Sequence, residues 1–138
     1  MIPVRRSILK LALAALACGT AACTDSTTGP AVPATAVVSL VTPSSNDGAL
    51  LITLSGPGLS DIQPANSFVR IYWRLVTETE ARVVVVGSLT AGPVFTVRLS
   101  DARPERYTAS LGEVADRTNA MREALAGYTL TLAVAPQP

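Results

Sequence analysis

Alternation of apolar and polar residues with a period of two constrains the fold of this chain more than any other feature. The segment Ser67–Val76 shows it most cleanly. One face carries Val69, Ile71, Trp73 and Leu75, and the other carries Phe68, Arg70, Tyr72 and Arg74. A strand in a sheet with one buried and one wet side produces this pattern, because successive side chains point to opposite faces. We therefore expect a strand here, with Trp73 in the core.

Six further segments have the composition and the period of strands. They are Ala36–Thr42, Ala49–Ser55, Arg82–Val86, Val94–Leu99, Tyr107–Val114 and Tyr128–Val134. The run Arg82–Val86 is apolar on both faces, which favours an interior strand that is covered on each side. Gly112 is a candidate for a β-bulge. Seven strands at short spacing predict an all-β domain, an antiparallel sandwich of about seven strands.

Turn and loop residues separate these segments. Ser44–Gly48 and Thr77–Glu80 have the composition of turns, and Leu59–Asn66 and Asp101–Glu105 that of loops. Asn119–Ala126 breaks the period of two. Asn119 can cap a short helix there, with Gly127 as its stop, so we expect one short helical turn before the last strand.

The first 22 residues differ in character from the rest of the chain. Arg5, Arg6 and Lys10 precede a short apolar run, Leu11–Ala17, and small residues follow it. This arrangement is typical of a secretory signal, and the run is too short for a membrane span. We expect residues 1–22 to be a signal peptide, 23–35 a flexible tether and 36–135 the sandwich domain.

The sequence Thr20-Ala21-Ala22-Cys23 resembles the lipobox of bacterial lipoproteins. The resemblance implies that the Cys23 thiol is acylated and becomes the first residue of the mature chain, which a lipid then anchors to the membrane. Acylation at Cys18 and simple cleavage near Ala22 are the alternatives. Thr24 rather than Asp follows Cys23, so the resemblance favours the outer membrane over retention at the inner membrane.

Charge and residue types narrow the function classes. Without the three cations of the leader, eight basic residues face ten acidic ones, a net charge of −2 that argues against nucleic acid as a partner. The chain has no histidine and two cysteines. Catalytic triads with histidine and zinc sites built on Cys and His are therefore excluded. We expect no enzyme activity, no cofactor and no metal.

Carboxylates are the remaining candidates for chemistry. Glu78 and Glu80 suit a glycosidase pair only in a concave cleft, and a solvated turn is the simpler interpretation. Asp101 and Glu105 lie among arginines, which indicates a surface charge cluster. Oxygen donors in loops could hold calcium, but turn capping explains them more simply. These donors are Asn46, Asp47, Asp61 and Asp101.

The side chains Phe68, Arg70, Tyr72 and Arg74 form the candidate binding face. Aromatic and arginine side chains two positions apart make a flat platform that stacks sugars or anchors proteins. The alternative is structural: these residues pair across strands, or the second sheet covers Phe68 and Tyr72.

The segments Gly48–Pro57, Val83–Gly87 and Tyr128–Leu132 resemble strands of small exported bacterial β-sandwich domains, of the cohesin-like and immunoglobulin-like groups. Cohesins bind dockerin partners through a sheet face, but no motif here corresponds to that partner. We therefore expect a non-catalytic envelope lipoprotein, on the periplasmic or outer surface, that binds or scaffolds a protein or glycan. A purely structural envelope protein and a carbohydrate-binding or carboxylate-dependent glycan-active module are the alternatives.

Overall fold

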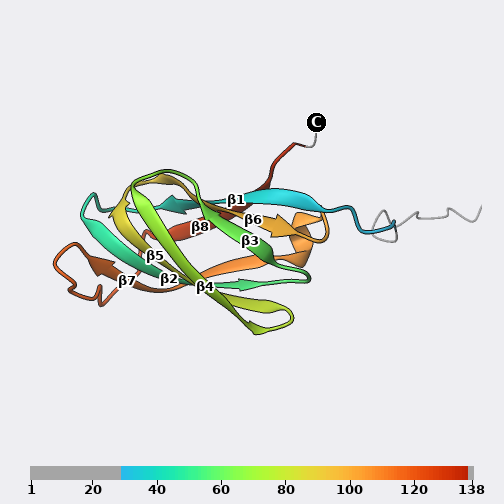
Figure 1. Cartoon of the computed structure of the whole chain (residues 1–138). Coiled ribbons are helices and arrows are strands. Elements are labelled where there is room, and N and C mark those ends of the chain that lie inside the picture. The colour runs from blue at the N-terminus through green and yellow to red at the C-terminus, as the bar shows by residue number, and fades with distance from the viewer. Residues whose placement is uncertain (1–28, 137–138) are drawn as a thin grey trace, which may run out of the picture.

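The structure is a computed structural model, and it describes residues 29–136. Two four-stranded antiparallel sheets pack face to face, as Figure 1 shows. The predicted all-β sandwich is therefore confirmed. The strands are β1 (Ala34–Val41), β2 (Asp47–Ser55), β3 (Ser60–Pro64), β4 (Val69–Thr77), β5 (Glu80–Leu89), β6 (Gly92–Leu99), β7 (Thr108–Asp116) and β8 (Thr129–Val134).

The strand order defines two sheets. Sheet A has the order β3-β6-β1-β8, and sheet B has the order β4-β5-β2-β7. The strands pair in a nested order: β4 with β5, β3 with β6, β2 with β7 and β1 with β8. This is the arrangement of one long hairpin whose tip lies between β4 and β5. The strands β1 and β2 lie in different sheets, whereas the first two strands of an immunoglobulin domain share one sheet.

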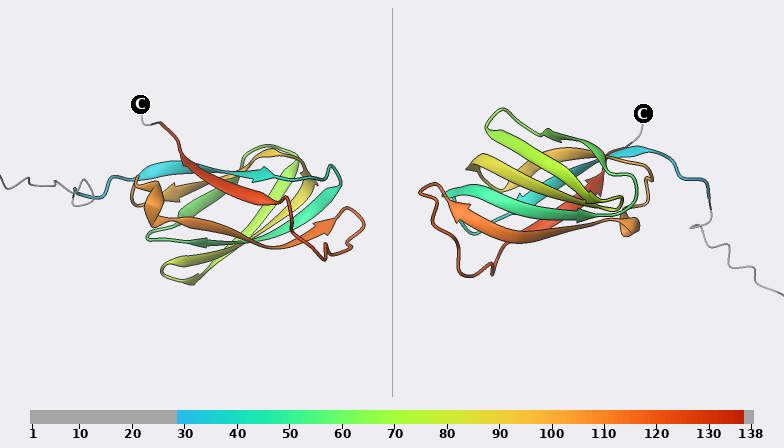
Figure 2. Two further views of the ribbon diagram at one scale, coloured as in Figure 1. Left: turned by 180° about the vertical axis from the view of Figure 1, so that it is seen from behind. Right: turned by 60° about the horizontal axis from the view of Figure 1, so that its bottom comes forward.

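The core lies between the sheets, and the two views of Figure 2 show both layers. Each fully buried aliphatic or aromatic side chain contributes roughly 1.5–3 kcal/mol. In β6 the predicted inward residues Phe95, Val97 and Leu99 are buried. A register shift opposite Val38 and Ser39 leaves Val94 without a partner, and Val94 is buried beside Phe95. The predicted bulge at Gly112 is confirmed, since Leu51 pairs with Glu113 and Ile52 with Leu111.

The eighth strand lies in a segment that the sequence predicts as a loop. Within Leu59–Asn66, residues Ser60–Pro64 pair with β6 as the edge strand β3. Only Ile62 of this strand is buried. Such a short edge strand depends on backbone pairing rather than on alternation, which explains why the sequence pattern misses it.

One short helical turn precedes the last strand, as predicted, but it is the 3-10 turn Pro104–Arg106. The segment Asn119–Ala126 forms no helix. Asn119 adopts a left-handed conformation with φ 66°, and the Asp116 carboxylate accepts hydrogen bonds from the backbone N–H groups of Thr118 and Ala120. The chain thereby reverses, and Met121 forms a bridge with Ala115 at the β7 edge.

Two predictions about burial in sheet B are wrong. Trp73 is not in the core, since 38% of it is exposed. It does share a face with the buried Val69, but sheet A covers only the first part of β4, because β3 is five residues long. β5 is an interior strand, yet its outer residues Val84 and Val86 are exposed. No element of the described structure covers that side.

The predicted signal peptide, residues 1–22, and the two cysteines, Cys18 and Cys23, lie outside the described residues. Of the predicted tether 23–35, residues Gly29–Pro33 have no regular structure, whereas Ala34 and Thr35 already belong to β1. Among the described residues, no helix is long and apolar enough to cross a membrane.

Candidate binding face

Pairing within sheet B brings the predicted binding residues next to apolar residues of β5 and β2. Arg70 pairs with Val86, Tyr72 with Val84 and Arg74 with Arg82. Val84 in turn pairs with Leu51 of β2. Since paired residues point to the same side of a sheet, these side chains share its outer surface. We call this surface the open face; it includes Arg70, Tyr72, Arg74, Arg82, Val84, Val86, Ala49, Leu51 and Met121, with one acidic residue, Glu113, opposite Leu51.

The open face exposes large apolar side chains. Tyr72 is 59% exposed, and Phe68, which precedes β4, is 72% exposed. Val84, Val86 and Met121 are exposed as well. A contiguous apolar surface of this kind marks interaction sites, because single scattered apolar residues suffice for an ordinary surface. Because Phe68 and Tyr72 are exposed, the alternative in which the second sheet covers them is wrong.

Two shallow hollows adjoin each other across the open face. The first is lined by Ala49, Leu50, Leu51, Val84, Glu113, Ala115 and Met121, and the second by Tyr72, Trp73, Arg74, Arg82 and Val84. Val84 lies between them and belongs to both. The lining of the first hollow is apolar apart from Glu113, and that of the second includes Arg74 and Arg82. A flat or gently curved ligand with apolar and anionic groups fits this surface.

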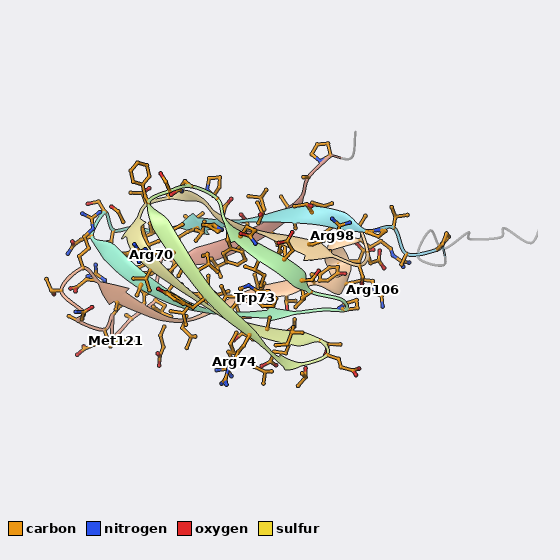
Figure 3. All side chains as sticks on the ribbon, viewed as in Figure 1. Arg70, Trp73, Arg74, Arg98, Arg106 and Met121 are labelled. Carbon is orange, nitrogen blue, oxygen red and sulfur yellow. The ribbon has the colours of Figure 1, made fainter. Side chains whose placement is uncertain are left out.

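Two of the three arginines of the open face, Arg70 and Arg74, have no ion pair within the described structure. Arg82 lies 3.7 Å from the Glu80 carboxylate, an exposed pair worth about 1 kcal/mol or less. Arg74 also stands directly opposite Arg82, an unfavourable like-charge pair. Figure 3 shows Arg74 at the lower side of the molecule, whereas Arg98 lies with sheet A on the other side.

Trp73 and Leu75 extend the apolar surface around the edge of sheet B. They point to the inner side of β4, past the part that β3 covers, and Leu75 is 49% exposed. The outer side of β4 differs, since it carries Tyr72 between Arg70 and Arg74. Figure 1 shows β4 at the edge of sheet B, beside β5.

The buried carboxylate of Asp47 is structural. Asp47 is not a turn residue as predicted but begins β2, fully buried. Its carboxylate accepts hydrogen bonds from Thr42 Oγ1 at 2.6 Å, Tyr128 OH at 2.9 Å and Arg122 Nη2 at 3.2 Å. The carboxylate in turn raises the pKa of the Arg122 guanidinium through the hydrogen bond between them. The network ties residues 122–128 to the start of β2.

Asp101 is the second buried carboxylate, so the predicted surface charge cluster is wrong for this residue. It accepts hydrogen bonds from Arg103 Nε at 2.9 Å and Arg106 Nη1 at 2.7 Å. The bonds from Arg103, with a smaller contribution from Arg106, hold the pKa of the Asp101 carboxyl well below its usual range, although burial opposes this. Its backbone N–H donates to Tyr107 OH, which donates to Pro57 O at 2.8 Å. The hydrogen bonds of Asp101 connect neighbouring parts of the fold, so its role is structural.

The structure places the carboxylates that the sequence singles out at separate positions. Glu78 lies at the exposed β4–β5 turn, and Glu80 faces Arg82. Asp61 is exposed and accepts a hydrogen bond from Gln63. Residues 29–136 contain no group of three or more His, Cys, Asp or Glu side chains that could hold a metal ion.

Sequence reasoning found one side of the open face and missed the other. It predicted Phe68, Arg70, Tyr72 and Arg74 as a surface, and the structure places Arg70, Tyr72 and Arg74 on the open face, with Phe68 exposed at its margin. It missed Val84, Val86, Leu51 and Met121. The sequence signal for Val84 and Val86 was the run Arg82–Val86 in β5, which is apolar on both faces. We interpreted this run as a strand covered on both sides.

Comparison with known proteins adds no relative to this description: no protein family, curated protein or solved structure matches the chain.

Proposed function

We propose that this chain is a non-catalytic cell-envelope lipoprotein whose β-sandwich binds or scaffolds a protein or glycan through the open face. The proposal places the domain on the periplasmic or outer surface of the envelope, with the outer membrane favoured. A lipid on Cys23 holds it there through the tether. Within the exported β-sandwich domains, the cohesin-like group is the proposed relative, because the strand order differs from that of immunoglobulin domains.

The single observation that supports a binding role is the apolar surface of sheet B, which no described residue covers and where Arg70 and Arg74 have no ion pair. Burying Tyr72 and the adjoining valines against a partner would remove apolar area from water, at roughly 25 cal/mol per Å². Arg70 and Arg74 would gain the counter-charges that the described structure lacks. Tyrosine and arginine are also the residue types that dominate the energetics of protein interfaces.

The anchor is tested by metabolic labelling with a palmitate analogue. We expect label on the wild type and on Cys18→Ala, and none on Cys23→Ala. Equal labelling of wild type and Cys23→Ala would remove Cys23 as the acylated residue. Label lost only in Cys18→Ala would move the anchor to that position.

Binding is tested by capture from a solubilised envelope extract with three forms of the protein, each checked by circular dichroism. They are the wild type, the open-face variant Arg70→Glu/Tyr72→Ala/Arg74→Glu, and the control Arg98→Glu on sheet A. We expect the wild type and Arg98→Glu to retain the same protein or glycan and the open-face variant to lose it. Equal capture by all three, or no specific capture by the wild type, would contradict the proposal.

A further inference from the structure

The edge of β4 is the least protected of the four sheet edges. Edge strands present unpaired N–H and C=O groups, and proteins guard them with short strands, proline, bulges or a covering segment. β4 is nine residues long, has no proline and pairs on one side only, with β5. Its register is regular from Val69 to Leu75. The seven residues from Val69 to Leu75 therefore offer a regular template for another strand.

The other three edges are guarded. β3 has five residues and ends at Pro64, and Asp61 within it has φ 47°, which breaks its pairing with β6. β7 is interrupted by the bulge at Gly112, and residues 120–122 occupy the end of its edge: Arg122 N donates to Val114 O at 2.8 Å, and Asp116 N donates to Ala120 O at 2.9 Å. β8 has six residues and lies beside β7, where the two sheets approach each other. β4 likewise lies beside an edge strand of the other sheet, β3. Among the four edge strands of the described structure, however, it alone combines nine residues, seven of them in unbroken register, with the lack of a covering segment.

The hydrogen bonds of β4 identify the backbone groups that face this edge. Ser88 N donates to Phe68 O, and the register continues through the pairs Arg70–Val86 and Tyr72–Val84. Hydrogen-bonded and non-hydrogen-bonded residues alternate in an antiparallel pair. The N–H and C=O groups of Ile71 and Trp73 therefore point away from β5, toward the free edge. An added strand would bond to these groups.

The arginines of β4 select the charge of that strand. Arg70 and Arg74 are four residues apart on the outer side, about 13 Å along the strand. If β4 of a second copy paired antiparallel with this β4, centred on Tyr72, Arg70 of each copy would lie opposite Arg74 of the other copy. Like charges directly opposite each other are destabilising. The same two arginines favour a strand that carries carboxylates on its outer side.

We propose that β4 binds an extended acidic peptide segment of a partner protein by β-strand addition. This rests on the proposed function and deepens it, since the segment would occupy the edge of the open face. Carboxylate side chains at alternate positions of the peptide face Arg70 and Arg74. The intervening apolar side chains pack beside Trp73 and Leu75, on the inner side that sheet A leaves uncovered. Backbone hydrogen bonds supply affinity, and the side chains supply specificity.

The probe is a phage-displayed library of random dodecapeptides selected on the full chain. We expect enrichment of proline-free sequences in which Asp or Glu alternates with apolar residues. A synthetic enriched peptide should change the fluorescence of Trp73, which is the chain's only tryptophan and lies in β4. Binding should weaken tenfold or more in Arg70→Glu/Arg74→Glu and stay unchanged in Arg98→Glu.

Backbone pairing is tested by two N-methylated forms of the enriched peptide, with methyl groups on either set of alternate nitrogens. One form should bind as the parent does, and the other should not bind. Equal binding by both forms, or enrichment of basic or helical sequences, would overturn strand addition. A different result would separate the two proposals. If no peptide were enriched, but the wild type retained an acidic polysaccharide that the open-face variant did not, peptide binding would be overturned and the proposed function would stand. If the wild type enriched no peptide and captured no specific protein or glycan, both proposals would be overturned.

Discussion

The two phenylalanines of the chain occupy opposite environments. Phe95 is fully buried between the sheets, whereas Phe68 is mostly exposed at the start of β4. We expect Phe95→Ala to lower the free energy of unfolding by about 3–5 kcal/mol, because it removes buried surface and leaves a cavity. Phe68→Ala should change it by about 0.5 kcal/mol or less. Urea denaturation of both variants measures the difference, and equal losses would contradict the described core.

Asp101 gives the stability of the protein an acid dependence. Its pKa in the folded protein is held well below its ordinary value of 3.8 by Arg103 and then Arg106. In the unfolded chain, the carboxyl takes up a proton at a pH where the folded carboxylate is still ionised. The unfolded state therefore binds more protons, and the free energy of unfolding falls as the pH decreases. This contribution is complete well above pH 4 and is lost below it.

We therefore expect Asp101→Asn to be less stable than the wild type at pH 7 and to lose less stability between about pH 5 and pH 2. Urea denaturation at several pH values measures both effects. Asp61→Asn, which removes an exposed carboxylate bonded to Gln63, is the control. The ion-pair account of Asp101 would be wrong if the wild type and Asp101→Asn had the same dependence on pH.

Buried carboxylates could not be predicted from the sequence. Asp47 lies in a stretch with turn composition, and its partners Arg122 and Tyr128 are 75 and 81 positions away. Local pattern says nothing about contacts at such separations. The inward residues of β6, in contrast, were predicted correctly, because alternation alone determines which side chains share a face.

At the scale of single elements, Gly87 keeps β5 in register beside the start of β4. Its φ is +151°, and a Cβ there would collide with the backbone oxygen of Phe68 and lie 2.9 Å from Val69 Cα. We expect Gly87→Ala to lower the free energy of unfolding by about 2 kcal/mol.

Gly112→Ala is the matched variant for this position. A Cβ there would meet Leu51 O at 3.4 Å, an ordinary contact, and the glycine has no positive φ. Its free energy of unfolding should stay within about 1 kcal/mol of the wild type. Thermal or urea denaturation compares the two variants. If Gly112→Ala cost as much as Gly87→Ala, backbone strain would not explain the role of Gly87.

Elements with a full alternating period were predictable, and those held by backbone pairing were not. β4 and β6 follow the period of two, and both were placed correctly. β3 contains one buried residue, Ile62, and forms because β6 offers an edge. The segment Asn119–Ala126 has the composition of a short helix, but Asp116 turns the chain back along β7 instead. Tertiary pairing thus overrides local propensity in both places.

At the scale of the whole molecule, the arrangement of the two sheets decides which faces meet water. Alternation predicted that Trp73 and Val69 share one face and that β5 is apolar on both, but it could not predict how far sheet A extends. Because β3 is short and no part of residues 29–136 lies over the outer side of sheet B, Trp73 and Val84 are exposed. The open face is therefore a property of the packing of two sheets, and only its β4 side was predictable.

The central claim is that a partner covers the open face where the protein works. Hydroxyl-radical footprinting compares the reactivity of Tyr72, Trp73 and Met121 on intact cells with that of the purified protein. Val41, about half exposed on sheet A, is the internal control. We predict that the three open-face and edge side chains are protected on cells while Val41 reacts equally in both samples. Equal reactivity of all four residues in both samples would contradict the claim.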